Sequence, residues 1–253
     1  MKKTILITGA TSGFGRATAE KFAAADYNVI ITGRRAEKLE TLKASLMQVY
    51  NVAVCALCFD VQDRSSVFAA IASLPEEFKT INILVNNAGL ALGREPFDEA
   101  EIDDWDTMMH TNVDGLLYVS RAVLPLLKMN KGAHIINVGS TASKEVYENG
   151  NVYCASKFAV DAITKAMRVD LLKHAIKVTG IYPGAANTEF SNVRFKGNDE
   201  KAADTYKGFE PLHAADVADA IFYCATLPPN VCINELVITC LAQASSYYIH
   251  KSN

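Results

Sequence analysis

The chain has 253 residues, of which 50% are hydrophobic and 21% charged, and its formal net charge is −3. This composition is typical of a globular protein with a sizeable core. The charge excludes both the basic surface that nucleic-acid binding needs and a polybasic membrane patch. No apolar run reaches the ~18 residues that cross a bilayer, and the short apolar start lacks the cleavage site of an export signal. We therefore expect a cytoplasmic protein.

The six cysteines do not have the pattern of a disulfide framework in a chain of this length. Cys55 and Cys58 form a C-x-x-C within the apolar run 52–59, which predicts a buried strand. Side chains three positions apart on a strand point to opposite faces, so these thiols are not able to bind one metal ion together. We expect core thiols and, because the histidines show no paired spacing, no metal site.

Strands and helices alternate along the whole chain. The apolar pattern predicts strand 4–8, helix 16–25, strand 28–32, helix 37–49, strand 52–59, helix 66–73, strand 81–85, helix 103–128, strand 133–138, helix 153–174, strand 177–182, helix 214–225 and strand 235–240. Short apolar strands separated by helices indicate a parallel sheet covered on both faces. We predict one α/β domain over residues 1–253 with a doubly wound, Rossmann-like sheet. The polar, irregular stretch 185–211 would form a substrate lid.

The turn between the first strand and the first helix is rich in glycine. Its spacing is G-x-x-x-G-x-G. Glycines allow the backbone to turn sharply and to approach a pyrophosphate, whose charge the helix N-terminus meets. A plain tight turn is the alternative, but the position after the first strand of an alternating pattern favours nucleotide binding. The residues expected to hold the cofactor here are Gly9, Thr11, Ser12, Gly13, Phe14 and Gly15.

The end of the second strand selects the form of the cofactor. An acidic residue there would bind the ribose 2′-hydroxyl of NAD and repel a 2′-phosphate. The sequence has Arg34 and Arg35 instead, whose guanidinium groups can bind a phosphate, so NADP is predicted. The alternative is a pair of solvated charges that open the next helix. Asp60, at the end of the third strand, is either an acceptor for the adenine amino group or the N-cap of the next helix.

Three polar residues form a candidate catalytic set. Tyr153 and Lys157 lie four residues apart on a predicted helix and share one face. Ser140 follows strand 133–138, at the edge where ligands bind in open α/β sheets. Reduction of a carbonyl leaves an alkoxide that needs a proton, and a nearby ammonium can lower the tyrosine pKa of ~10 by ~1–3 units to suit that task. The alternatives are a chance pair on a helix surface and, for Ser140, a helix cap.

These motifs occur in one order over residues 9–188, and the chain resembles the short-chain dehydrogenase/reductase family. The resemblance implies that Tyr153 transfers the proton and that Lys157 both tunes it and holds the nicotinamide ribose. Ser140 would orient the carbonyl oxygen, and Asn112 would hold a water that completes a proton relay. The further cofactor-binding residues that the resemblance implies are Asp60, Val61, Asn87, Ala88, Gly89, Pro183, Gly184, Ala186 and Thr188.

Two positions depart from the family pattern. Gly139 stands before Ser140 where many members have another serine, and we expect this difference to matter little. Ala186 replaces a branched aliphatic residue in the P-G-x-x-x-T motif that ends at Thr188. Because backbone groups there would hold the nicotinamide carboxamide, we expect the smaller side chain to weaken packing more than recognition.

The stretches 89–93, 150–153 and 188–197 resemble the NADP-dependent 3-hydroxy acid dehydrogenases. This branch acts on serine, L-allo-threonine, 3-hydroxypropionate-type acids and malonic semialdehyde. Arg194, in the predicted lid, offers a bidentate partner for a substrate carboxylate, and the alternative is a solvated lid surface.

Two other functions stay open at this point. One is a reductase of neutral ketones or sugars, and the other is a nucleotide-sensing binding protein without turnover. The complete set of Ser140, Tyr153 and Lys157 argues against the second.

The predicted helix 153–174 is apolar well beyond the one stripe that would cover the sheet, with Phe158, Ile163 and Met167 among its residues. This pattern indicates that a second surface packs against the helix, and the family resemblance implies a homotetramer built on paired long helices. Apart from a small-molecule substrate, we expect no nucleic-acid or membrane partner.

Overall fold

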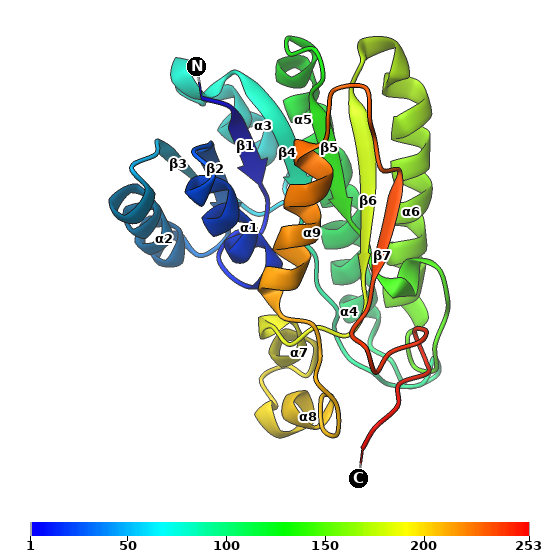
Figure 1. The fold of residues 1–253 in the computed structure, drawn as a ribbon. Coiled ribbons are helices and arrows are strands. Elements are labelled where there is room, and N and C mark those ends of the chain that lie inside the picture. Colours follow the sequence, from blue (N-terminus) through cyan, green and yellow to red (C-terminus); the bar gives the residue numbers. More distant parts are fainter. Residues whose placement is uncertain (1, 253) are drawn as a thin grey trace.

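Seven parallel strands form one sheet in the computed structural model, which describes residues 2–252 (Figure 1). The strand order is β3-β2-β1-β4-β5-β6-β7, so the direction of winding reverses between β3 and β4. The predicted doubly wound α/β fold is thereby confirmed. The strands are β1 (Thr4–Ile7), β2 (Asn28–Gly33), β3 (Val54–Cys58), β4 (Ile81–Asn86), β5 (His134–Val138), β6 (Lys177–Pro183) and β7 (Glu235–Ile238).

Helices cover both faces of the sheet because successive strand residues point to opposite sides. Ile5 and Ile7 of β1 pack into the core on one face and Leu6 into the core on the other, and all three are fully buried. The first face is covered by α1 (Gly13–Ala24), α2 (Ala36–Tyr50) and α9 (Ala214–Thr226). The second is covered by α3 (Arg64–Ala72), α5 (Gly115–Lys128) and α6 (Asn151–Leu171).

Strand β3 corrects the expectation of buried core thiols. It lies at one edge of the sheet and pairs with β2 alone. Cys58 is exposed and Cys55 is half-buried, because an edge strand is covered less completely than the central strands. Within residues 2–252 no group of three or more His, Cys, Asp and Glu side chains is arranged to hold a metal ion.

The predicted helix 103–128 is two helices rather than one. Helix α4 (Ile102–Met109) and helix α5 are joined by a π-helical segment, His110–Asp114, that contains Asn112. Such bulges widen one helical turn and occur often at functional sites. Gly115 opens α5 next to Val61, since a Cβ at residue 115 would lie 2.7 Å from Val61 Cγ2.

The predicted irregular stretch 185–211 contains two short helices, α7 (Glu189–Arg194) and α8 (Asp199–Asp204). In Figure 1 both lie at the lower end of the molecule, beyond the carboxyl ends of the strands and on the same side as the C-terminal segment. None of the helices in the described part of the chain is long and apolar enough to cross a membrane.

Candidate active site

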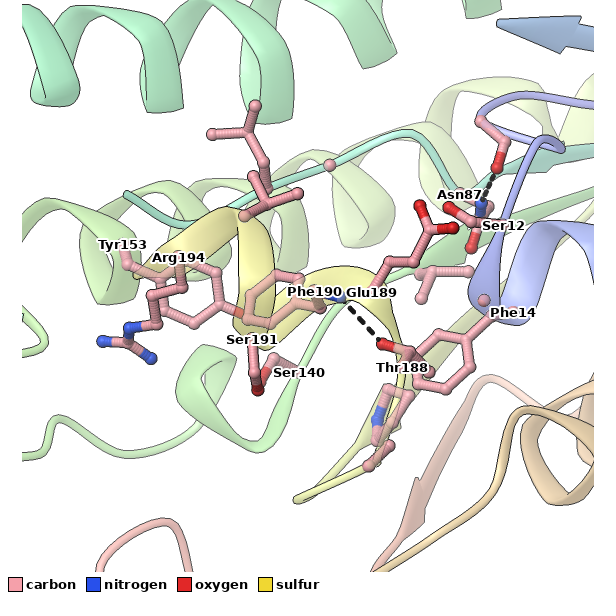
Figure 2. Close-up of a pocket in the computed structure, with 18 of the residues that line it drawn as sticks. Ser12, Phe14, Asn87, Ser140, Tyr153, Thr188, Glu189, Phe190, Ser191 and Arg194 are labelled. Carbon is pink, nitrogen blue, oxygen red and sulfur yellow. Dashed lines mark hydrogen bonds between the residues drawn. The ribbon is translucent and has the colours of Figure 1, made fainter. Parts of the chain in front are cut away.

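A cavity of about 440 Å³ opens at the carboxyl ends of the strands, where the order reverses between β1 and β4. Every predicted site residue lines it except Gly15 and Asn112, which lie behind its wall. Figure 2 shows Phe14 and its neighbours in the glycine-rich turn at one end and Tyr153 and Arg194 at the other, with α7 extending between them.

The glycine-rich turn has a backbone that only glycine adopts easily. Gly9 and Gly13 have φ angles of 65° and 50°, in the left-handed region. A Cβ on Gly15 would lie 2.4 Å from the carbonyl oxygen of Gly9, so a side chain there would push the helix off the turn. The main chain of the turn therefore forms the cavity wall itself. This cradle, followed by the N-terminus of α1, suits the pyrophosphate of a dinucleotide.

Arg35 lies at the base of the glycine-rich turn. It donates to Thr11 Oγ1 at 2.7 Å and to Ser12 Oγ at 3.1 Å, and its Nη1 lies 2.8 Å from a carboxylate oxygen of Glu189 on α7. Lys38 meets the other oxygen of Glu189 at 3.1 Å. Two cations thus converge on the Glu189 carboxylate, with two hydroxyls beside Arg35, at the place where a 2′-phosphate is predicted.

Arg34 and Asp60 form a looser pair at 3.4 Å. The Asp60 carboxylate also accepts from the backbone N–H of Gln62 at 3.0 Å. The N-cap of α3 is Asp63, which accepts from the N–H groups of Ser65 and Ser66, so the N-cap alternative for Asp60 is wrong. Asp60 instead faces the cavity.

Tyr153 and Lys157 come from the first two turns of α6, and both are buried. Lys157 Nζ donates to the carbonyl oxygen of Val138 at 3.1 Å and lies 6.0 Å from the centre of the Tyr153 ring. Ser140 follows β5 and accepts from the N–H of Ala142 at 3.1 Å, which caps a short 3-10 turn. The segment that follows β5 and the first turns of α6 therefore meet at one wall of the cavity.

Burial dominates the electrostatics of this wall. It raises the pKa of Tyr153 well above its usual value; Tyr147 adds to the rise, while the Ser140 hydroxyl and Arg194 oppose it. Burial also lowers the pKa of Lys157 to about 8. In the protein without cofactor, the groups that favour the phenolate are Ser140 and Arg194. A pKa-lowering role for Lys157 stays a prediction.

Asn112 is buried in the π-helical segment with its side chain fully engaged. Its Nδ2 donates to Leu90 O at 2.9 Å and to Ser156 Oγ at 3.0 Å, and its Oδ1 accepts from Leu90 N at 2.8 Å. These bonds fix the segment after β4 against α6. The Asn112 side chain therefore holds the wall together, and the water relay stays a prediction.

Arg194 ends helix α7 beside the candidate catalytic tyrosine. Its guanidinium carbon lies 5.5 Å from the centre of the Tyr153 ring, Nη1 donates to Tyr147 Oη at 2.9 Å, and Nε donates to Gly93 O at 3.1 Å. These contacts are incompatible with a purely solvated lid surface. They place a cation at the end of the cavity where Tyr153 carries its proton (Figure 2).

Several cavity residues escaped the sequence-based prediction. Tyr147 and Phe190 flank Tyr153, and the Phe190 ring centre lies 5.7 Å from that of Tyr153. Gln243 and Ser246 come from the C-terminal segment, and Gln243 Oε1 accepts from the N–H of Ala185 at 2.7 Å. No local spacing identifies these residues, because each reaches the cavity only through long-range packing.

Comparison with known proteins identifies relatives along almost the whole chain. The family model that matches, over residues 3–199, is that of the short chain dehydrogenases. The NADP-dependent 3-hydroxy acid dehydrogenase YdfG of Salmonella typhi is 45% identical over 98% of this chain and 99% of its own. Sulfoacetaldehyde reductase 2 of Chromohalobacter salexigens is 46% identical over 98% of each chain.

Solved structures give the same result. The closed form of serine dehydrogenase complexed with NADP+ superposes with a TM-score of 0.91 at 45% identity, covering 98% of this chain and 99% of that one. Serine dehydrogenase from Escherichia coli gives a TM-score of 0.81 at 40% identity, covering 95% and 99%.

The buried ammonium of Lys157 predicts a pH-dependent stability. The pKa of Lys157 is lower in the folded protein than in the unfolded chain, so burial of the charged form destabilises the native state below about pH 8. This penalty fades as the pH rises towards the unfolded value. We expect the free energy of unfolding of the wild type to rise relative to that of Lys157→Met between about pH 8 and about pH 10.5, the folded and unfolded pKa values of Lys157. Urea denaturation of the two proteins over this pH range measures the difference between their free energies of unfolding. A difference that does not change with pH would contradict the lowered pKa of Lys157.

Proposed function

Because the chain belongs to the short-chain dehydrogenase family, we propose that it is an NADP-dependent oxidoreductase acting on the hydroxyl or carbonyl carbon of small 3-hydroxy acids. The observation that carries the substrate class is the position of Arg194, whose guanidinium lies against the Tyr153 ring. A substrate oxygen within reach of Tyr153 would then have its acid group within reach of a fixed cation.

The cavity suits NADP at its other end. The glycine-rich turn offers backbone to a pyrophosphate, and Arg35, Lys38 and the hydroxyls of Thr11 and Ser12 offer donors to a 2′-phosphate. The cofactor supplies or accepts the hydride when it is bound. We assign the 2′-phosphate to Arg34 and Arg35 together, because both line the cavity; the phosphate would compete with Asp60, 3.4 Å from Arg34, and with Glu189, 2.8 Å from Arg35.

Tyr153 would hold the proton that the substrate oxygen gains on reduction or loses on oxidation. At neutral pH its raised pKa keeps the hydroxyl protonated in the protein without cofactor, which is the form that serves reduction. Ser140 would orient the substrate oxygen towards the Tyr153 hydroxyl. Lys157, fixed by Val138, would hold the ribose and add positive charge next to the developing phenolate.

The anionic substrate class also fits the relatives. Serine has a carboxylate and sulfoacetaldehyde a sulfonate, and the proteins that bear those names are 45–46% identical to this chain. Both groups present oxygens that a guanidinium binds in bidentate fashion. In a reductase of neutral ketones or sugars, the half-buried Arg194 guanidinium would keep only its neutral partners, Tyr147 and the Gly93 carbonyl, and would meet no anionic group of the substrate.

We also propose a cytoplasmic homotetramer in which residues 185–211 act as the lid of a single domain. Three exposed apolar residues on or just after α6 support an assembly through that helix. Phe158 is 40% exposed, and Val169 and Leu172 are each 75% exposed. Apolar side chains along one helix at this level of exposure favour burial against a second subunit.

The replacement Tyr153→Phe keeps the ring and removes the proton. If proton transfer has its usual effect, kcat falls ~100- to 10,000-fold while the affinity for NADP changes little. Initial rates and cofactor titration measure the two quantities. Activity within a few-fold of wild type would remove Tyr153 from this role.

The double replacement of Arg34 and Arg35 by Ala tests the cofactor assignment. We expect a strong rise in the KM for NADP and little change in the weak use of NAD, because only NADP carries the 2′-phosphate. Arg121→Ala, at an exposed position on α5 that does not line the cavity, is the matched control. Equal losses with both cofactors would assign the two arginines to the fold or to the shared pyrophosphate.

The replacement Arg194→Met keeps much of the apolar length and removes the guanidinium. Charge-assisted hydrogen bonds contribute ~1.5–3 kcal/mol, so kcat/KM for a 3-hydroxy acid falls roughly 10- to 150-fold. A neutral alcohol of the same size keeps its slow rate. Lys201→Met, at an exposed position on α8, controls for general loss of lid charge. Parallel losses on acid and neutral substrates would make Arg194 a lid residue without a role in recognition.

A further inference from the structure

A charged cluster lies behind the cavity wall, between β6, β7 and α6. Its centre is the buried carboxylate of Asp161, which accepts from Tyr182 Oη at 2.6 Å and from the ammonium groups of Lys144 and Lys165, both at 2.8 Å. Glu235 of β7 lies 2.6 Å from Lys144 and 3.5 Å from Lys165. None of these five residues, called here the Asp161 cluster, lines the cavity.

Three members of the Asp161 cluster are close in sequence to site residues. Asp161 lies one helical turn after Lys157 on α6, Lys144 follows the turn that begins at Ser140, and Tyr182 immediately precedes Pro183. The cluster therefore connects the three segments that form the catalytic end of the cavity.

The ring of Tyr182 sits in a slot that only glycines leave open. A Cβ on Gly139 would lie 2.5 Å from Tyr182 Cδ1, and a Cβ on Gly180 would lie 2.2 Å from Tyr182 Oη. Lys144 Nζ covers the ring at 4.0 Å from its centre. A serine at position 139 would overlap the tyrosine ring, so the packing requires glycine there, and how much this matters for activity stays a prediction.

The carboxylate of Asp161 stays charged in this buried place. Burial alone would raise its pKa, but the hydrogen bonds from Lys144, Lys165 and Tyr182 lower the pKa to about 2. The Asp161 carboxylate holds its three donors firmly. If one of the donors moved away, it would leave the buried carboxylate without one of its hydrogen-bond partners.

We propose that Tyr182 is a positioning residue for the proposed reaction. Its hydroxyl is fixed by Asp161 on α6, and its ring limits how closely Gly139 can approach. Through these two contacts it sets the distance between Ser140 and the helix that carries Tyr153. This inference rests on the catalytic roles proposed for Ser140 and Tyr153, and it goes beyond them, because Tyr182 does not line the cavity.

The replacement Tyr182→Phe leaves the ring in its slot and removes only the bond to Asp161. Small displacements of reacting groups are costly, so we expect kcat to fall roughly 10-fold or more, with the KM for NADP nearly unchanged. Thr179→Val is the matched control. It removes a buried hydroxyl from the same strand, β6, but at the other end, where Thr179 donates to Ile233 O at 2.6 Å. Thr179→Val should lower the melting temperature about as much as Tyr182→Phe does, but it should leave kcat within about two-fold of wild type.

A double-mutant cycle tests the ring contact independently. Gly139→Ala should reduce kcat about 10-fold in the presence of Tyr182 and much less in a Tyr182→Ala background, where the slot is open. The remaining close atom, Ser143 Oγ at 2.9 Å, accepts from the N–H of Ser140, and because it is present in both backgrounds its effect cancels in the cycle.

Two results would overturn the inference: a kcat for Tyr182→Phe no lower than that for Thr179→Val, or an equal effect of Gly139→Ala in both backgrounds. If Tyr182→Phe does not fold, the kcat of Gly139→Ala is compared with that of the wild type instead. An unchanged kcat for Gly139→Ala would also overturn the inference. Failure of the proposed function itself is distinguishable, because it would appear as an active Tyr153→Phe enzyme.

Discussion

The cavity depends on one hydrogen-bonded contact between the ends of β1 and β4. Thr8 Oγ1 accepts from the backbone N–H groups of Asn87 and Ala88, both at 2.9 Å, and Asn87 Nδ2 donates to the carbonyl oxygen of Thr8 at 2.8 Å. The two strands are neighbours only because the sheet order reverses here. By holding the two loops together, these bonds leave the backbone of the glycine-rich turn free to face a cofactor, as phosphate binding requires.

Helix α7 connects the two ends of this cavity. Its first residue, Glu189, is paired with Arg35 and Lys38 at the cofactor end, and its last, Arg194, is bonded to Gly93 and Tyr147 at the substrate end. This six-residue helix therefore spans the cavity from Arg35 and Lys38 to the residues beside Tyr153.

The catalytic end combines burial with few but well-fixed charges. Tyr153 and Lys157 lie on α6 with their polar atoms in a water-poor wall, where electrostatic interactions are stronger than in solution. Burial also lowers the pKa of the Lys157 ammonium, which donates to the carbonyl oxygen of Val138. The Asp161 cluster, one turn further along the helix, supplies a compensated charge that keeps α6 in register with the sheet.

Sequence alone determined the α/β alternation, the glycine-rich turn, and the Tyr153–Lys157 pair, because each is a local pattern with its own periodicity or spacing. Nearly all of the residues that it assigned to the site line the cavity, since the carboxyl ends of parallel strands must share one edge, but other lining residues such as Tyr147 and Gln243 were not foreseen. Only the tertiary structure decided which strand lies at the edge and so left Cys58 exposed, where the helix 103–128 widens at Asn112, and why residue 139 is glycine. These features depend on neighbours far along the chain, Tyr182 against Gly139 above all, and no local pattern encodes such a contact.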